Sequence, residues 1–149
     1  MYAEVFLILL MIMGLGIGLV CPMNSLAASL QIDFTPTVKG DFKVQVDVET
    51  NLPNGSTLAA KITKHGLRES VLFVGTDFVK FVVSNGVASA LINAEMNAQP
   101  SINHITKGKY DVEVTFYPMW RENREIANML GIRTEIEAIK VIELIGNGK

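Results

Sequence analysis

The chain has 149 residues, of which 49% are apolar and 19% charged. This composition excludes an intrinsically disordered chain, and the length fits one domain with a short appendage. The formal net charge is −2, so no basic surface for nucleic acid or anionic lipid is expected. The single cysteine, Cys21, lies in the apolar N-terminal stretch, which excludes a disulfide framework or a thiolate metal site in the rest of the chain.

The N-terminal stretch predicts export. All sixteen residues from position 5 to position 20 are apolar or glycine, and Ser25-Leu26-Ala27 then places small residues where a signal peptidase cleaves. We therefore expect residues 1–27 to be a signal peptide and residues 28–149 to form a periplasmic or extracellular domain. Because the first four residues include no lysine or arginine, an uncleaved membrane anchor over residues 5–23 stays open as the alternative.

Alternation of apolar and polar residues predicts β-strands through most of the domain. Pro36 ends the first strand or confines it to a sheet edge, because proline donates no backbone hydrogen bond. A short apolar run at 71–74 indicates one further strand, and residues 93–109 form a long connection with one helical turn. The alternating strands are expected at residues 30–34, 42–48, 58–63, 78–83, 87–92 and 110–117.

Two turns between these strands predict hairpins. The compact turn 51–56 favours direct pairing of the strands 42–48 and 58–63. Asn85 and Gly86 both tolerate positive φ, which a type I′ turn requires, so they predict a second hairpin between the strands that flank them.

The last third of the chain predicts one helix and one strand. Residues 120–130 favour a helix that ends at Gly131, and in such a helix Arg121 and Glu125 would be spaced for an ion pair. Residues 132–145 fit both a helical stripe and a strand. We favour a closing strand, because β-branched residues supply most of this run and a sandwich needs its last edge covered.

Residues 105–114, Ile-Thr-Lys-Gly-Lys-Tyr-Asp-Val-Glu-Val, resemble the entry to the F strand of immunoglobulin-like and fibronectin type III-like sandwiches. The resemblance implies that the hydroxyl of Tyr110 bonds back to nearby backbone as a tyrosine corner. The chain lacks the paired core cysteines and the early tryptophan of immunoglobulin domains, which suits the fibronectin-like form better. The expected fold is an all-β, single antiparallel β-sandwich of this type, with an N-terminal hydrophobic signal or anchor helix and a short helix near residues 120–130.

Residues 51–58 together with residues 108–114 resemble exported bacterial proteins of unassigned function, which carry a similar Asn-Leu-Pro turn and a late Gly-Lys-Tyr strand. Both motifs consist of residues that favour turns and so encode folding. The resemblance therefore implies a fold and an exported location, and it implies no activity.

The chain offers no recognisable catalytic set. His65 and His104 are the only histidines, and neither has the spacing of a metal site, so we expect no metal and no cofactor. No G-x-S-x-G nucleophile turn is present. We expect the carboxylates that share a strand face to point to solvent, namely Asp47 with Glu49 and Asp111 with Glu113. These absences favour a protein that is not an enzyme.

The leading functional hypothesis is a non-enzymatic cell-envelope module that binds another envelope or extracellular protein or serves a structural role. Loops at the ends of the sandwich, at residues 67–70, 97–107 and 118–124, are the expected contact regions. Trp120 beside Arg121 has the composition of an interface hot spot, but burial of this tryptophan in the core is the interpretation we favour. The candidate binding residues are Arg68, His104, Trp120 and Arg121.

The rival hypothesis is a small-ligand or carbohydrate-binding domain, with or without hydrolysis, whose cleft lies near residues 117–125. Tyr117 and Trp120 would contact the ligand, and Glu122 and Glu125 would supply paired carboxylates. This hypothesis requires the two carboxylates to converge in a concave pocket.

Overall fold

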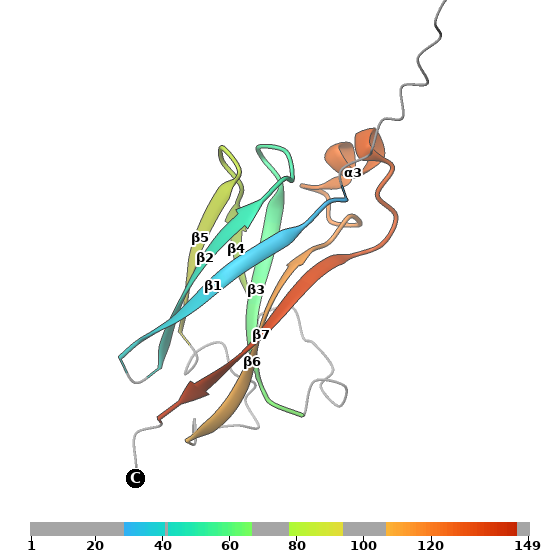
Figure 1. Ribbon diagram of the computed structural model, residues 1–149. Helices are drawn as coiled ribbons and strands as arrows, with labels where there is room; N and C mark the ends of the chain where they lie inside the picture. Colours follow the sequence, from blue (N-terminus) through green and yellow to red (C-terminus); the bar gives the residue numbers. More distant parts are fainter. Residues whose placement is uncertain (1–28, 41, 67–77, 94–106, 146–149) are drawn as a thin grey trace, which may run out of the picture.

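The computed structural model describes residues 29–40, 42–66, 78–93 and 107–145, which form two antiparallel β-sheets and one short helix (Figure 1). One sheet has the strand order β1-β2-β5, and the other has the order β4-β3-β6-β7. The all-β prediction is therefore confirmed. The elements are β1 (Ile32–Lys39), β2 (Lys43–Thr50), β3 (Thr57–Lys64), β4 (Val79–Val82), β5 (Val87–Asn93), β6 (Gly108–Phe116), α3 (Arg124–Leu130) and β7 (Ile136–Leu144).

Several predicted segments lie outside the described residues. They include the signal peptide or anchor over residues 1–27, the short strand at 71–74 and most of the long connection that follows β5. Within the described ranges, no helix has both the length and the apolar character needed to cross a membrane.

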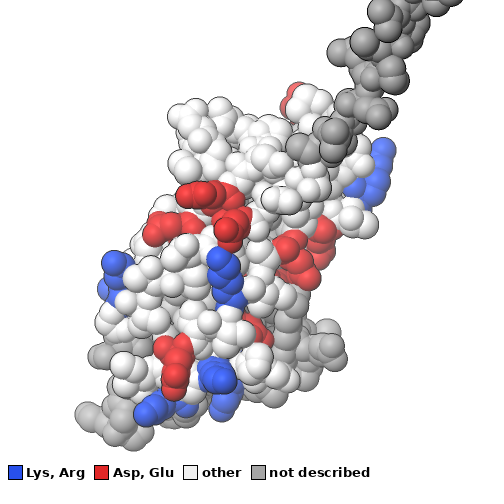
Figure 2. Space-filling view, in the orientation of Figure 1, with Lys and Arg blue, Asp and Glu red and all other residues white. Residues whose placement is uncertain are grey.

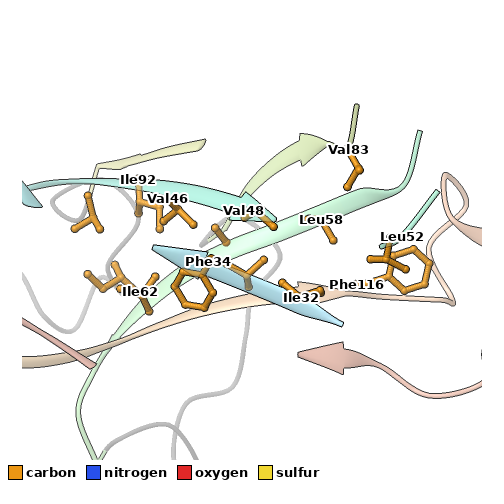
Figure 3. Close-up of a cluster of buried hydrophobic side chains, with 14 of the residues drawn as sticks. Ile32, Phe34, Val46, Val48, Leu52, Leu58, Ile62, Val83, Ile92 and Phe116 are labelled. Carbon is orange, nitrogen blue, oxygen red and sulfur yellow. The ribbon is translucent and has the colours of Figure 1, made fainter. Parts of the chain in front are cut away.

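The two sheets face each other through alternating apolar side chains (Figure 3). In β2 every second residue is buried, as the alternation predicted. Removing apolar surface from water contributes roughly 25 cal/mol per Å², so this face supplies most of the stabilisation of the fold. The opposed residues, each at most 5% exposed, are Val44, Val46 and Val48 of β2 and Leu58, Ala60 and Ile62 of β3.

The hairpin predicted across the turn 51–56 is wrong. β2 pairs with β1 and β5, whereas β3 pairs with β4 and β6, so the turn carries the chain from one sheet to the other. The apolar faces of β2 and β3 bury each other across the core, which a flat two-stranded ribbon does not allow. Leu52, in the middle of this turn, is 3% exposed and joins the same buried cluster as Phe116.

The second predicted hairpin has the expected turn and different strand partners. Asn85 and Gly86 have φ values of 53° and 78°, and Ser84 and Val87 exchange backbone hydrogen bonds of 2.9 and 3.1 Å. Beyond this turn the strands separate, because β4 pairs with β3 and β5 pairs with β2. The predicted type I′ turn is confirmed, whereas the predicted pairing of the two flanking strands with each other is wrong.

The predictions for the last strands agree with the structure, whereas the first strand, expected at 30–34, runs from Ile32 to Lys39 and continues past Pro36. β1 lies at a sheet edge, and Pro36 is tolerated there because one side of the strand lacks a ladder partner. β6 contains the predicted strand near residue 110, and Tyr110 is 2% exposed. Its corner hydrogen bond stays a prediction. Residues 132–145 contain the strand β7, which pairs with β6 along its whole length, so the alternative of a helix there is wrong.

The predicted helix over residues 120–130 forms only from Arg124 onward. It ends where the sequence indicated, at Gly131, whose φ of 69° is left-handed. The backbone N–H groups of Gly131 and Ile132 bond the carbonyls of Asn128 and Ala127, which is a Schellman motif. Residues 121–123 form a turn instead of the first helical turn.

A cross-linking experiment separates the sandwich from the hairpin. In a Cys21→Ser chain, Gln45→Cys with Leu91→Cys should form a disulfide on mild oxidation, measured by peptide mass spectrometry. Gln45 and Leu91 are Cα partners in the β2–β5 ladder, and such partners lie about 4.5–5.5 Å apart.

The control pair is Asp47→Cys with Ala60→Cys, which a hairpin across the turn 51–56 would bring together. These positions lie in different sheets, roughly 10 Å apart, so this pair should stay reduced. Efficient bridging of the control pair would contradict the strand order.

Candidate functional site

Two of the four candidate binding residues can be placed. Trp120 and Arg121 lie on the connection between β6 and β7, at residues 117–135, whereas Arg68 and His104 lie outside the described residues, as do the contact loops 67–70 and most of 97–107. The connection occupies the same end of the sandwich as the turns 51–56 and 84–86 (Figure 1). We call this end, with α3 on it, the α3 end.

Trp120 is half-buried and packs on the surface of the sandwich. Its ring centroid lies 4.7 Å from that of Tyr117, with which it stacks, and 5.2 Å from that of Phe78. The ammonium group of Lys80 lies 4.2 Å from the centroid of the tryptophan ring and also bonds Glu122 at 2.9 Å. Trp120 is therefore neither a core residue nor an open hot spot, because its own chain already contacts much of the ring.

The carboxylates near Trp120 point into solvent. Glu122 and Glu125 are both exposed, and no cavity described at this end is lined by either of them. The hydrogen bond from Lys80 lowers the pKa of Glu122, whereas a general acid needs a raised pKa. As placed, the pair does not provide the acid that the hydrolytic hypothesis requires.

Arg121 extends into solvent from the turn that precedes α3. The ion pair with Glu125 that a longer helix would allow is not among those of the described residues, since α3 begins only at Arg124. The guanidinium of Arg121 is therefore available at the surface of the α3 end.

Asn123 anchors the connection, a role that the sequence did not reveal. It is 0% exposed, and its amide oxygen accepts a hydrogen bond from the backbone N–H of Thr57 at 2.7 Å. Its amide nitrogen donates to the carbonyls of Thr57 at 2.8 Å and Tyr117 at 3.0 Å. An asparagine just before a helix normally indicates a cap, yet this side chain makes no capping bond. It joins the connection to the first residue of β3 instead.

The α3 end exposes large apolar side chains. Met119, Met129 and Leu130 are 79%, 69% and 41% exposed, and α3 itself fully buries only Ala127. Pro118 and Met119 line two shallow hollows of about 200 and 470 Å³, into which Arg133 also extends.

A larger hollow of about 700 Å³ lies on the outer face of the three-stranded sheet. Figure 2 shows acidic side chains gathered on this face, and those that line the hollow are Asp33, Asp47 and Glu49. Asp33 and Glu49 are Cα partners in the β1–β2 ladder. Asp47 accepts hydrogen bonds from Ser89 at 3.0 Å and Gln45 at 3.1 Å, and Gln45 also bonds Ser89.

Asp33 is bound by a lysine from the opposite sheet. The ammonium group of Lys140 lies 2.8 Å from Asp33 and 5.4 Å from the centroid of the Phe34 ring. The hydrogen bond from Lys140, followed by one from the backbone N–H of Phe34, lowers the pKa of Asp33. The pair joins β1 to β7 along the side of the sandwich where these two strands lie next to each other.

The carboxylates on the outer face of the four-stranded sheet are less exposed than predicted. Asp111 and Glu113 point away from the core as expected, but they are 8% and 2% exposed instead of solvated. Glu113 forms an ion pair with Lys61 at 2.6 Å, and Asp111 bonds His65 at 2.6 Å. β6 is a central strand, so residues of β3 and β7 flank both carboxylates. Within the described ranges, no three metal-ligating side chains cluster.

Replacing the buried asparagine tests its anchoring role. Asn123→Ala should lower the free energy of unfolding by about 1–3 kcal/mol, because it leaves the buried backbone groups of Thr57 without their side-chain partner. Urea denaturation followed by the fluorescence of Trp120 measures this change. The matched control, Asn128→Ala on the exposed side of α3, should stay within about 0.5 kcal/mol of the parent. Equal losses in both variants would contradict the anchor.

The Asp33 carboxyl should titrate below the ordinary aspartate value of about 3.9. Because the pKa of Asp33 is lowered in the folded state, the ion pair stabilises the fold at pH values above the ordinary aspartate pKa. This stabilisation is lost as the pH falls through the lowered pKa. The contribution is small, since Asp33 is exposed and solvent screens the pair.

Carboxyl NMR titration is the measurement. Lys140→Met should raise the pKa of Asp33, whereas Lys80→Met should raise that of Glu122 and leave Asp33 unchanged. If the pKa of Asp33 is the same in Lys140→Met as in the parent, the ion pair does not form in solution.

Comparisons with known proteins provide no family for this chain. No family model matches it, and neither a curated protein nor a solved structure does. Its function therefore has to be inferred from the sandwich, from the residues of the α3 end and from the outer faces of the two sheets.

Proposed function

We propose that the chain is an exported, non-enzymatic β-sandwich module of the cell envelope or extracellular space, and that it binds a partner protein through its α3 end. Recognition there involves exposed apolar side chains on a connection that is held rigidly to the sandwich. Arg121 at its margin adds a charged contact.

The observation that carries this proposal is the exposure of Met119, Met129 and Leu130. The core is complete without them, since apolar residues of both sheets already fill it. Methionine adapts its shape to a partner surface, so these side chains would suit an apolar contact. The hydrogen bonds of Asn123 hold the connection in place, so little conformational entropy is lost when a partner binds.

The strand order supports an immunoglobulin-like or fibronectin type III-like sandwich. If the strands are lettered in the usual way, one sheet has the order A, B, E and the other C′, C, F, G. Loops at one end of such sandwiches commonly carry recognition, because a rigid scaffold positions them while they remain free to vary. The proposal of export rests on the apolar stretch at residues 5–20 and the small residues that follow it.

Photo-cross-linking tests the binding surface. In a Cys21→Ser chain, a benzophenone label on Met119→Cys should form a discrete adduct with an envelope protein, detected by mass spectrometry. The matched control is the same label on Ile145→Cys, which is similarly exposed at 75% but lies at the opposite end of β7, and this control should form no such adduct.

Competition completes the test. An excess of unlabelled parent chain should abolish the adduct, whereas the Met119→Ser, Met129→Ser double variant should compete at least about tenfold less well, since each lost hot spot costs more than 1 kcal/mol. Equal competition by the double variant, or the same adduct from both labels, would refute binding through the α3 end.

A further inference from the structure

The smaller hollow of the α3 end has two arginines among otherwise uncharged lining residues. Its volume is about 200 Å³, and Arg124 and Arg133 supply its charged groups. Among the described residues, no carboxylate lines it. The uncharged lining residues are Pro118, Met119, Ala127, Asn128 and Ile132. The hollow is therefore positively charged, and it adjoins the exposed side chain of Met119.

The end of α3 brings the two arginines together. Arg124 and Asn128 are four residues apart in the helix, so they lie on one helical face. The guanidinium of Arg133, which follows the end of the helix, lies 3.5 Å from the side-chain oxygen of Asn128. Both arginines are therefore neighbours of Asn128, and both line the same hollow.

The two guanidiniums are not neutralised within the described part of the chain. No ion pair there includes Arg124 or Arg133. Glu125 follows Arg124 directly, but adjacent residues of a helix do not face each other. Glu135 and Glu137 line the larger neighbouring hollow instead. Because a guanidinium has five N–H donors, both arginines can bond an incoming acceptor.

The size and lining of the hollow suit a side chain of another protein. Pockets for small molecules have volumes of about 300–1,000 Å³, whereas this hollow has only about 200 Å³. Methionine and arginine are enriched in protein interfaces, and both residue types line it. An arginine is also suited to bind a carboxylate through two parallel hydrogen bonds.

We propose that the partner segment bound by the α3 end carries an aspartate or glutamate beside a large apolar residue. The carboxylate enters the smaller hollow and accepts hydrogen bonds from Arg124 and Arg133, and the apolar neighbour packs on Met119. The opposite charges are complementary, whereas a basic segment would place like charges together. This inference rests on the proposed function, because it names the chemistry of the partner at the same surface.

The probe is a seven-residue peptide with blocked ends, Ser-Gly-Leu-Glu-Leu-Gly-Ser, added to the isotope-labelled full-length chain in non-ionic detergent. Amide NMR signals of Asn128, Ile132 and Arg133 should shift as the peptide binds. The same peptide with glutamine in place of glutamate should bind at least about tenfold more weakly, because it lacks the charge. A lysine version should not bind.

Variants of the chain locate the site. Arg124→Gln with Arg133→Gln should weaken binding of the glutamate peptide at least about tenfold. The matched control, Lys39→Gln with Lys43→Gln, removes two positive charges at the end of the β1–β2 ladder far from the turn 51–56, and it should bind as the parent does. Arg124→Glu with Arg133→Glu should reverse the preference, so that the lysine peptide binds and the glutamate peptide does not.

Several outcomes would overturn the proposal. Equal affinity for the glutamate and glutamine peptides, or no binding of the glutamate peptide, would refute the acidic occupant. The same shifts from inorganic phosphate alone, at equal affinity, would assign the hollow to a free anion. A dimer of the chain that Arg124→Gln with Arg133→Gln dissociates, without peptide binding, would assign it to a second copy.

The photo-cross-link at Met119→Cys separates this inference from the proposed function. If the adduct forms and the Arg124→Gln, Arg133→Gln chain competes as well as the parent, the partner binds at the α3 end and the acidic occupant is refuted. If no specific adduct forms while the glutamate peptide still binds, the envelope partner alone is refuted.

Discussion

The fold depends on one constraint, which is that the apolar faces of consecutive strands must bury each other. β2 and β3 each carry apolar residues at every second position, and a flat hairpin of the two would leave these residues in water. Placing them in opposite sheets buries both faces at once. The turn 51–56 and the turn at Asn85 therefore both change sheets, and Leu52 covers the end of the core where the first of them crosses.

The same constraint shapes the α3 end. The connection from β6 to β7 has to return along the sandwich, and Asn123 holds it to β3 through two buried hydrogen bonds with the backbone of Thr57. A buried amide is stable only when its donors and acceptor are satisfied, so this residue fixes one position of the connection. Gly131 then ends α3 after seven residues and directs the chain into β7. The exposed methionines are displayed on a structure that is already ordered.

The two outer faces of the sandwich differ in physical character. On the four-stranded sheet, Lys61 and Glu113 form a buried ion pair, and such a pair is costly to desolvate. On the three-stranded sheet the carboxylates of Asp47 and Glu49 stay exposed beside an uncharged edge strand.

The sequence alone determined the strands, the type I′ turn, the end of α3 at Gly131 and the all-β class, because each depends on local periodicity or on the φ preference of single residues. It singled out Trp120 and Arg121, although it favoured burial of Trp120 in the core, and it gave no signal for the anchor at Asn123 or the exposure of Met119. Only the tertiary structure decided which strands pair and which carboxylates are buried. Those features depend on contacts between residues far apart in the chain, such as Asn123 with Thr57, and on the way the two layers face each other.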